Sequence, residues 1–408
     1  MKSPFYKIWL VDNQNKDITD YVDSFDYEDC LAEDDMLTLK ITTKGFEFLE
    51  KKEVAVGKML NFQFGYLQGL TSVLHQARIT DVDTTYADSV SITIKAYDMG
   101  TVMKKSKEQV IWKNKKSSEI AKEIAKKYNL QAQIEETKQV FASLPQGSKT
   151  DFQFLSYLAS IEKNGSFRFY LKDNTLFFNK LDLKKTPKRL FVYQDKNSES
   201  NIISFKPSLK ESTQQSSGNN AKSVSFDPLS GVKKVAEVDD KTAKDNTKLG
   251  NEVIRYDVNA IKIAGTFNAA KTVKPTETTN SIPSANTSLD HLTNKANRKK
   301  KGDSEKVLVA TLTIEGDPTL LADEIITMAG VAKMHAGNWY IEKIKHNISS
   351  SGYITTLELS KNAINKNGAG GAGTGALAGV PQNQQVGSAK TEEKKVIPKY
   401  DVNSKRIN

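Results

Sequence analysis

The sequence contains a single cysteine, Cys30, and only four histidines among its 408 residues. One cysteine excludes an internal disulfide framework and argues against a cysteine-based zinc site. The histidines lie far apart in the chain, with neither HExxH nor any other spacing typical of metal ligands. A metal hydrolase therefore has little support, and we expect Cys30 to be a small, half-buried residue of a strand-rich segment.

Long apolar runs and nucleotide- or ester-cleaving motifs are also missing. No stretch approaches the roughly 18 consecutive apolar residues of a membrane span, and the N-terminus lacks the pattern of a signal peptide. There is no GxSxG elbow, and the glycine run "GAGGAGTG" lacks the strand and the lysine of a phosphate-binding loop. We predict no enzyme activity, with no catalytic, cofactor-binding or metal-ligating residues, no cofactor and no stable membrane insertion.

Charge of one sign is not concentrated in any domain-sized region. The 59 basic and 49 acidic residues give a net charge of +10, spread over nearly every segment. A basic stripe interleaved with aromatic residues is absent, so we predict no specific nucleic-acid recognition. One dense cluster, Lys295 to Lys301, follows a short helical pattern. It is interpreted as a solvated helix end, and contact with a polyanion stays open.

Alternation of apolar and polar residues marks the first 100 residues. Leu37, Leu39 and Ile41 fall on one face of one such segment, and "MLNFQFGY" and "SVSITIKAYD" repeat the pattern. A period of two, repeated this often, predicts antiparallel strands with one buried face, as in a sandwich or a small barrel.

The period changes after residue 100. "SSEIAKEIAKKYNL" carries an apolar helical stripe, with its serines as the expected cap. Thr150 and Gln153 have the spacing of a capping box at the start of "DFQFLSYLASI". The segment "SFRFYLKDNTLFF" then predicts two strands joined at Asp173 and Asn174. A compact helix-and-hairpin module follows the first β domain.

This module resembles a known family. "DFQFLSYLA" followed by "NGSFRFYLKDNTLFF" is similar to the middle domain of the phage late control protein D family. Its members are baseplate hub proteins of contractile-tailed phages, related to the hub part of type VI secretion spike proteins. A predicted hairpin turn at Asp227, Pro228 and Gly231 also resembles a turn of this family.

An ordered set of residues in the second half is similar to the same family. The set is Gly316, Asp317, Pro318, Leu320, Gly337, Trp339, His346, Gly352, Tyr353 and Thr355. One departure is Asp323, because family members commonly have glycine at this place. Aspartate tolerates left-handed backbone geometry better than most residues, so we expect the turn to survive.

The stretch "IEGDPTLL", Ile314 to Leu321, allows two interpretations. Glu315 or Asp317 could serve as a catalytic acid on a loop. In the other interpretation the stretch is a turn that ends a strand: Gly316 gives backbone freedom, Asp317 bonds the local backbone, Pro318 fixes the exit and Leu320 returns to the core. We predict the turn.

The resemblance implies a mainly β fold with an α+β insertion: two small β barrels of tail-hub type, separated by a helix-and-hairpin domain, and a flexible C-terminal tail. We place the first barrel at residues 1–100 and the α/β middle domain at 101–200. The second barrel is placed at 201–362, with a polar insertion at about 239–300, and the Gly/Ala-rich and polar tail at 363–408.

For function, the resemblance implies a structural baseplate hub in a contractile tail or related injection system. Such a hub is a homotrimer that joins the tail tube, or a tube-initiator protein, to the central spike protein, with baseplate wedge proteins as further partners. It would be located in the tail baseplate of the virion or particle, after assembly in the bacterial cytoplasm. The segment "SSEIAKEIAKKYNL" also faintly resembles the helix of LysM cell-wall modules. A peptidoglycan-binding or lytic tail component therefore stays open as the alternative.

Overall fold

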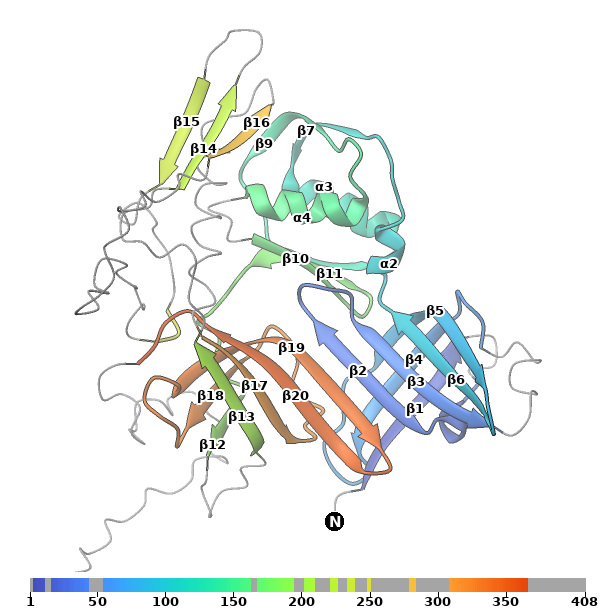
Figure 1. Ribbon diagram of the computed structural model, residues 1–408. Coiled ribbons are helices and arrows are strands. Elements are labelled where there is room, and N and C mark those ends of the chain that lie inside the picture. Colours follow the sequence, from blue (N-terminus) through green and yellow to red (C-terminus); the bar gives the residue numbers. More distant parts are fainter. Residues whose placement is uncertain are drawn as a thin grey trace, which may run out of the picture.

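The computed structural model describes residues 3–11, 16–43, 54–162, 167–193, 202–209, 221–226, 233–238, 248–250, 279–283 and 308–365. Within these residues the protein is mainly β, with a helix-containing module placed between two β units, which confirms the predicted fold class (Figure 1). Several predictions lie outside the described residues: the turn at Asp227, Pro228 and Gly231, the Lys295–Lys301 cluster, and the C-terminal tail beyond residue 365.

In the described residues, the first β unit contains six antiparallel strands. They are β1 (Pro4–Val11), β2 (Ser24–Cys30), β3 (Met36–Thr43), β4 (Met59–Tyr66), β5 (His75–Tyr86) and β6 (Val90–Tyr97). Their hydrogen-bonded order is β1-β4-β5-β6-β3-β2. The alternating residues predicted for the core are buried, with Leu37, Leu39 and Phe62 at most 1% exposed. Burial of one face of each strand is the hydrophobic driving force for this unit.

The second β unit repeats this topology. Its strands are β12 (Arg189–Val192), β13 (Ile202–Leu209), β17 (Leu308–Glu315), β18 (Ile325–Ala329), β19 (Gly337–Ser349) and β20 (Gly352–Lys361). Taken in chain order, these six strands correspond one by one to β1 to β6. The hydrogen-bonded order of the second unit is β12-β18-β19-β20-β17-β13, which matches the order β1-β4-β5-β6-β3-β2 of the first unit. One difference is that β12 and β18 are parallel, whereas β1 and β4 are antiparallel.

The two β units share one continuous sheet because β2 pairs with β19. The register places Tyr27 opposite His346 and Phe25 opposite Ile348. The end of the β19–β20 hairpin enters the core of the first unit, where Ile348 and Tyr353 are buried. Barrel closure is not detected, since within the described residues the ladder runs from β1 to β13 and its two ends do not pair.

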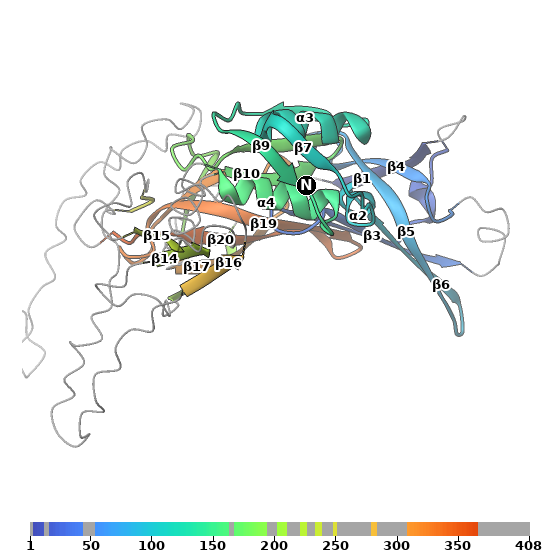
Figure 2. The same ribbon diagram turned by 90° about the horizontal axis from the view of Figure 1, so that it is seen from above.

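The middle module sits above both β units (Figures 1 and 2). It consists of α2 (Gly100–Met103), β7 (Ile111–Lys116), α3 (Ser117–Lys127), β8 (Gln131–Ile134), β9 (Val140–Pro145), α4 (Asp151–Ile161), β10 (Phe167–Lys172) and β11 (Thr175–Lys180). Helix α4 has the predicted capping box: Gln153 N–H donates to Thr150 Oγ1 at 3.2 Å, and Thr150 N–H donates to Gln153 Oε1 at 3.1 Å. The predicted β10–β11 hairpin is confirmed, with Lys172 opposite Thr175.

The serines expected to cap α3 lie inside its first turn instead. The residue before the helix is Lys116, whose N–H donates to Glu119 Oε2 at 2.8 Å, and Ser118 N–H donates to Thr137 Oγ1 at 3.1 Å. A glutamate and a distant threonine thus satisfy the donors that the serines were expected to satisfy.

A separate sheet contains β14 (Ala221–Phe226), β15 (Lys233–Val238) and β16 (Thr279–Pro283). Strands β14 and β15 are antiparallel neighbours, as expected for the predicted hairpin, and β16 pairs in parallel with β14. Among the described helices, none has the length and apolar character needed to cross a membrane.

Candidate functional site: the junction of the three units

The turn in "IEGDPTLL" lies where the two β units meet. Gly316 N–H donates to Tyr353 O at 3.0 Å, and its carbonyl accepts the Tyr66 hydroxyl of β4 at 3.0 Å. A Cβ at Gly316 would lie 2.1 Å from the Tyr353 ring. Close approach of an aromatic ring, rather than a left-handed backbone, therefore explains the glycine.

Asp317 organises the turn and holds it to β12. Its Oδ1 accepts Thr319 N–H at 3.0 Å and the Thr319 hydroxyl at 2.7 Å, and its Oδ2 accepts Arg189 Nε at 2.9 Å. Its own N–H donates to Thr355 Oγ1 at 3.0 Å. Because both carboxylate oxygens have structural partners, the arrangement favours the turn over the catalytic acid.

The remaining motif residues fall at two places. Pro318 and Leu320 are buried at the exit of the turn, while Gly352 (φ +119°) and Tyr353 begin β20 beside it. Gly337 (φ +96°) and Trp339 begin β19, where Trp339 is fully buried in the core of the second unit. The structure thus brings Gly316, Asp317 and Tyr353 together and separates them from Gly337 and Trp339.

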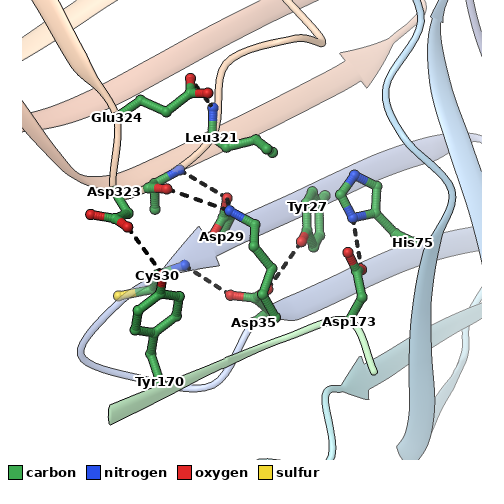
Figure 3. Close-up of polar contacts among 12 residues, drawn as sticks. Tyr27, Asp29, Cys30, Asp35, His75, Tyr170, Asp173, Leu321, Asp323 and Glu324 are labelled. Atoms are coloured by element: carbon green, nitrogen blue, oxygen red, sulfur yellow. Dashed lines mark hydrogen bonds and ion pairs between the residues drawn. The ribbon is translucent and has the colours of Figure 1, made fainter. Parts of the chain in front are cut away.

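Asp323 connects the middle module to the second β unit (Figure 3). Its φ is +73°, which is left-handed backbone geometry that aspartate tolerates better than most residues. Its carboxylate lies 2.6 Å from Arg168 Nη2 and 2.7 Å from Lys185 Nζ, and it accepts the hydroxyls of Tyr170 and Tyr340 at 3.0 Å each. Burial alone would raise the pKa of Asp323, but the two cations outweigh burial and lower it.

A second ion pair connects the middle module to the first β unit. Lys172, at the end of β10, lies 2.7 Å from Asp29 Oδ2, and both side chains are largely buried. Ala322 N–H of the second unit donates to the same Asp29 oxygen at 2.9 Å. Burial alone would lower the pKa of Lys172, but Asp29 and Asp35 raise it. One carboxylate oxygen therefore contacts residues from the two other units (Figure 3).

Buried carboxylates continue behind this pair. Asp35 Oδ1 accepts Cys30 N–H at 2.9 Å, and its Oδ2 accepts the Tyr27 hydroxyl at 3.1 Å. Burial, with Asp29 and Asp98 close by, raises the pKa of Asp35 well above its ordinary value. Burial and the neighbouring Asp34 raise the pKa of Asp98 to about 7. These shifts follow from crowding of acidic groups in a desolvated space.

Two histidines lie fully buried among the aromatic side chains at the junction. His75 Nδ1 is 2.9 Å from Asp173 Oδ1, at the tip of the β10–β11 hairpin. His346 Nδ1 is 2.9 Å from the Tyr353 hydroxyl, and burial lowers the pKa of His346 to about 3. His346 therefore stays neutral at physiological pH inside a packed sheet, as a core residue does, and this favours a packing role over that of a general base.

The chemistry of the junction is that of a connection between units. Among the residues described, no group of three or more histidine, cysteine, aspartate or glutamate side chains could hold a metal ion. Cys30 is buried in β2, and burial raises the pKa of its thiol. Sequence reasoning missed Asp29, Lys172 and Arg168, because they come from segments far apart in the chain. The local signal that the sequence offered was Asp323, expected at a turn with left-handed backbone geometry.

Comparison of the fold with solved structures finds phage tail proteins. The tail protein from Neisseria meningitidis MC58 aligns with a TM-score of 0.59 and 12% identity, covering 89% of this chain and 98% of that one. The 43 kDa tail protein of prophage MuSo2 from Shewanella oneidensis aligns with a TM-score of 0.60 and 12% identity, covering 88% and 99%. The half-lidded Francisella PdpA–VgrG complex aligns at 0.50 and 11%, covering 90% of this chain and 59% of that chain.

At these identities the likeness concerns the fold alone, and the protein has a fold of the phage tail type. A search of curated proteins finds no match. The model of one protein family, described as the Alg8 N-terminal domain, matches residues 35–350. This match spans more than half of the sequence, and the chain therefore belongs to the Alg8 N-terminal domain family.

Proposed function

We propose that the protein is the structural hub of a contractile phage tail or a related injection system. In this proposal three copies form an adaptor between the tail tube, or a tube-initiator protein, and a central spike protein, held in the baseplate by wedge proteins. The observation that carries it is the likeness of fold to two phage tail proteins over 98% and 99% of their own lengths. We also propose that the chain is related to the late control protein D family, on the basis of the residues between Gly316 and Thr355. The proposed domain boundaries lie at residues 100, 200 and 362.

The repeated β unit supports an adaptor between different symmetries. Each chain has two units of the same strand order, so three chains would present six similar units around a common axis. Such a ring suits a sixfold partner on one face and a threefold partner on the other. The junction supports a rigid hub, because Asp29 contacts the middle module and the second β unit through one oxygen.

Co-expression with the spike, tube and wedge proteins of the same particle tests the proposal. We expect the full-length protein to co-purify with the spike and to be found in the baseplate of assembled particles. The alternative, a cell-wall component, predicts sedimentation with peptidoglycan or clearing of cell walls in a zymogram. Absence from particles together with either of these activities would overturn the hub.

A further inference from the structure

The middle module has a hydrophobic core of its own. Within the described residues, its buried cluster extends from Met103 to Phe178 and contains no residue of either β unit. Side-chain contacts at the junction and the chain connections therefore place the module. The connection to the first β unit is α2, which follows β6 and lies between that strand and the rest of the module (Figure 1). A change at α2 thus acts on the attachment of the whole module.

Two carboxylates of the first β unit hold α2 at its two ends. Asp98, directly after β6, accepts Gly100 N–H through Oδ1 at 2.7 Å. Asp34, in the loop between β2 and β3, accepts Lys104 Nζ through Oδ2 at 2.8 Å. Asp98 Oδ2 also accepts Asp35 N–H of this loop, at 3.4 Å. The loop, the end of β6 and α2 are therefore fastened to one another by Asp34 and Asp98, which we call the carboxyl pair.

The carboxyl pair meets beside Gly100. A Cβ at Gly100 would lie 2.3 Å from Asp34 Oδ1 and 2.9 Å from Asp98 Oδ1, so both oxygens approach the same point. Asp34 Oδ1 is buried and has no hydrogen-bond partner among the described residues, and the Asp34 side chain is 8% exposed. Two carboxylates in a desolvated space cannot both be ionised at little cost. One proton between them would also give the buried Asp34 oxygen the partner that it lacks.

The charged groups around the carboxyl pair leave an excess of negative charge. They come from α2, the β2–β3 loop, β2 and β10, and are Lys104, Asp35, Asp29 and Lys172. With the pair itself, four carboxyl groups therefore face two ammonium groups. Burial and the neighbouring Asp34 raise the pKa of Asp98 to about 7. Bound protons thus balance the charge of this region at acidic pH.

We infer that Asp34 and Asp98 share one proton, and that this proton controls a hinge between the first β unit and the middle module. While the proton is bound, α2 is fastened to the first β unit. When the proton leaves to water, the two negative charges repel each other beside Gly100. Asp98 holds the first N–H group of α2, so this repulsion loosens α2 and the module that follows it. The inference goes beyond the proposed function and holds whether or not the protein is a hub.

The pH range and size of the effect follow from Asp98. Opening the hinge returns its carboxyl from a pKa of about 7 to its ordinary value of 3.8. Because the open state binds its proton more weakly, its population grows as the pH rises from about 4 to 7 and is constant at higher pH. Between pH 5 and pH 7 the population of the open state is expected to increase about fiftyfold.

Hydrogen exchange of the full-length protein, followed by mass spectrometry, tests the hinge. Exchange of the amides of α2 is measured at pH 5 and pH 7, and each rate is divided by that of an unstructured peptide at the same pH. The resulting protection of α2 is expected to be about fiftyfold lower at pH 7. The amides of α4, in the core of the module, should keep equal protection at both pH values. Equal protection of α2 at both pH values would overturn the inference without any variant.

Asp98→Asn removes the titrating group and keeps its contacts. Its side-chain oxygen still accepts Gly100 N–H, and its NH₂ group can donate to Asp34 Oδ1, as the shared proton does. The protection of α2 is therefore expected to be the same at pH 5 and pH 7. Asp83→Asn is the matched control, because its side chain on β5 of the same unit is 66% exposed, and it should retain the fiftyfold fall. A fall that persists in Asp98→Asn would show that another group is responsible.

Distances between two spin labels test whether the module moves with α2. The labels are placed by Asp88→Cys, exposed beside β6, and Lys122→Cys, exposed on α3, while the buried Cys30 stays unlabelled. Labelled protein is diluted with unlabelled protein, so that distances within one chain are measured. We expect a broader distance distribution at pH 7 than at pH 5, and no broadening after addition of Asp98→Asn.

Two other outcomes would overturn the inference. Loss of α2 protection at pH 7 without a change in the label distances would mean that α2 frays by itself and the module stays in place. Recovery of α2 protection at pH 7 on addition of Ca²⁺ or Mg²⁺ would mean that the carboxyl pair holds a cation in place of a proton. Neither outcome bears on the proposed function, which is tested by association with the spike.

Discussion

Substitution of Asp323 by asparagine tests how the middle module is held to the second β unit. Asparagine tolerates the left-handed backbone at φ +73° but carries no charge. Arg168, whose side chain is 17% exposed, would then lose a carboxylate 2.6 Å away. Removing one partner of a largely buried ion pair costs about 3 to 5 kcal/mol. Asparagine still accepts one of the two tyrosine hydroxyls, so we expect a loss of about 3 kcal/mol.

The three tryptophans make this loss measurable by unit. Trp9 lies in β1, Trp112 in β7 and Trp339 in β19, so single-tryptophan variants report separately on the first β unit, the middle module and the second β unit. In urea, Asp323→Asn is expected to separate the Trp112 transition from the Trp339 transition. Lys185→Ala, which removes a more exposed cation from the same carboxylate, serves as the control and should cost less than about 1 kcal/mol.

The charge can also be removed from both sides of the pair. Addition of Arg168→Met to Asp323→Asn is expected to recover part of the loss, because the buried guanidinium no longer lacks a counter-charge. The pH dependence has a defined sign, because the folded pKa of Asp323 lies below its ordinary value of 3.8. The contribution of the Asp323 carboxylate to the free energy of unfolding is fully present above pH 3.8 and is lost as the pH falls through the folded pKa. Asp323→Asn within about 0.5 kcal/mol of the parent protein would refute the reasoning.

Three further predictions concern single substitutions. Gly316→Ala is expected to lower the free energy of unfolding by about 1 to 3 kcal/mol, because its Cβ would lie 2.1 Å from the Tyr353 ring; an unchanged urea midpoint would contradict this close approach. Asp98→Asn is expected to stabilise the protein at pH 8 by at least about 1 kcal/mol and to have little effect near pH 4. The folded pKa of Asp98 is about 7 and its ordinary value is 3.8, so the carboxyl costs stability progressively as the pH rises from about 4 to 7, and equal effects at both pH values would argue against this. Lys361→Met is expected to raise the thermal midpoint at pH 7, because burial lowers the pKa of Lys361 to about 8 and the buried ammonium lowers the stability of the folded protein below that pH. Ala336 O loses its bond from Lys361 but keeps its bond from Asn365. The gain should shrink toward pH 10, and a lower midpoint at pH 7 would contradict the prediction.

Local patterns in the sequence predicted the elements whose signals lie within a few residues. The alternation in β3 and β4, the Thr150–Gln153 capping box and the turn after Lys172 all appear in the structure. The caps of α3 were predicted less well, since Thr137 is distant and Glu119 took the role given to the serines. Each success rests on backbone geometry that a short peptide already specifies.

The junction was not predictable in the same way. Lys172 and Ala322 both contact one carboxylate oxygen of Asp29. The three residues belong to three different units, and nothing in the sequence of any one segment indicates the other two. The shared strand order of the two β units is also invisible in the sequence, because pairing, rather than residue identity, is what repeats. Asp323 was noticed only as a departure from glycine, and its four polar partners required the fold.

The mass of the purified full-length protein in solution, alone and with its spike partner, tests the central claim most directly. Multi-angle light scattering is expected to give three times the 45.3 kDa of one chain in at least one of these conditions. A ring of three would then be available to present six similar β units. A single chain of 45.3 kDa that stays monomeric at high concentration and with the spike present would contradict the hub.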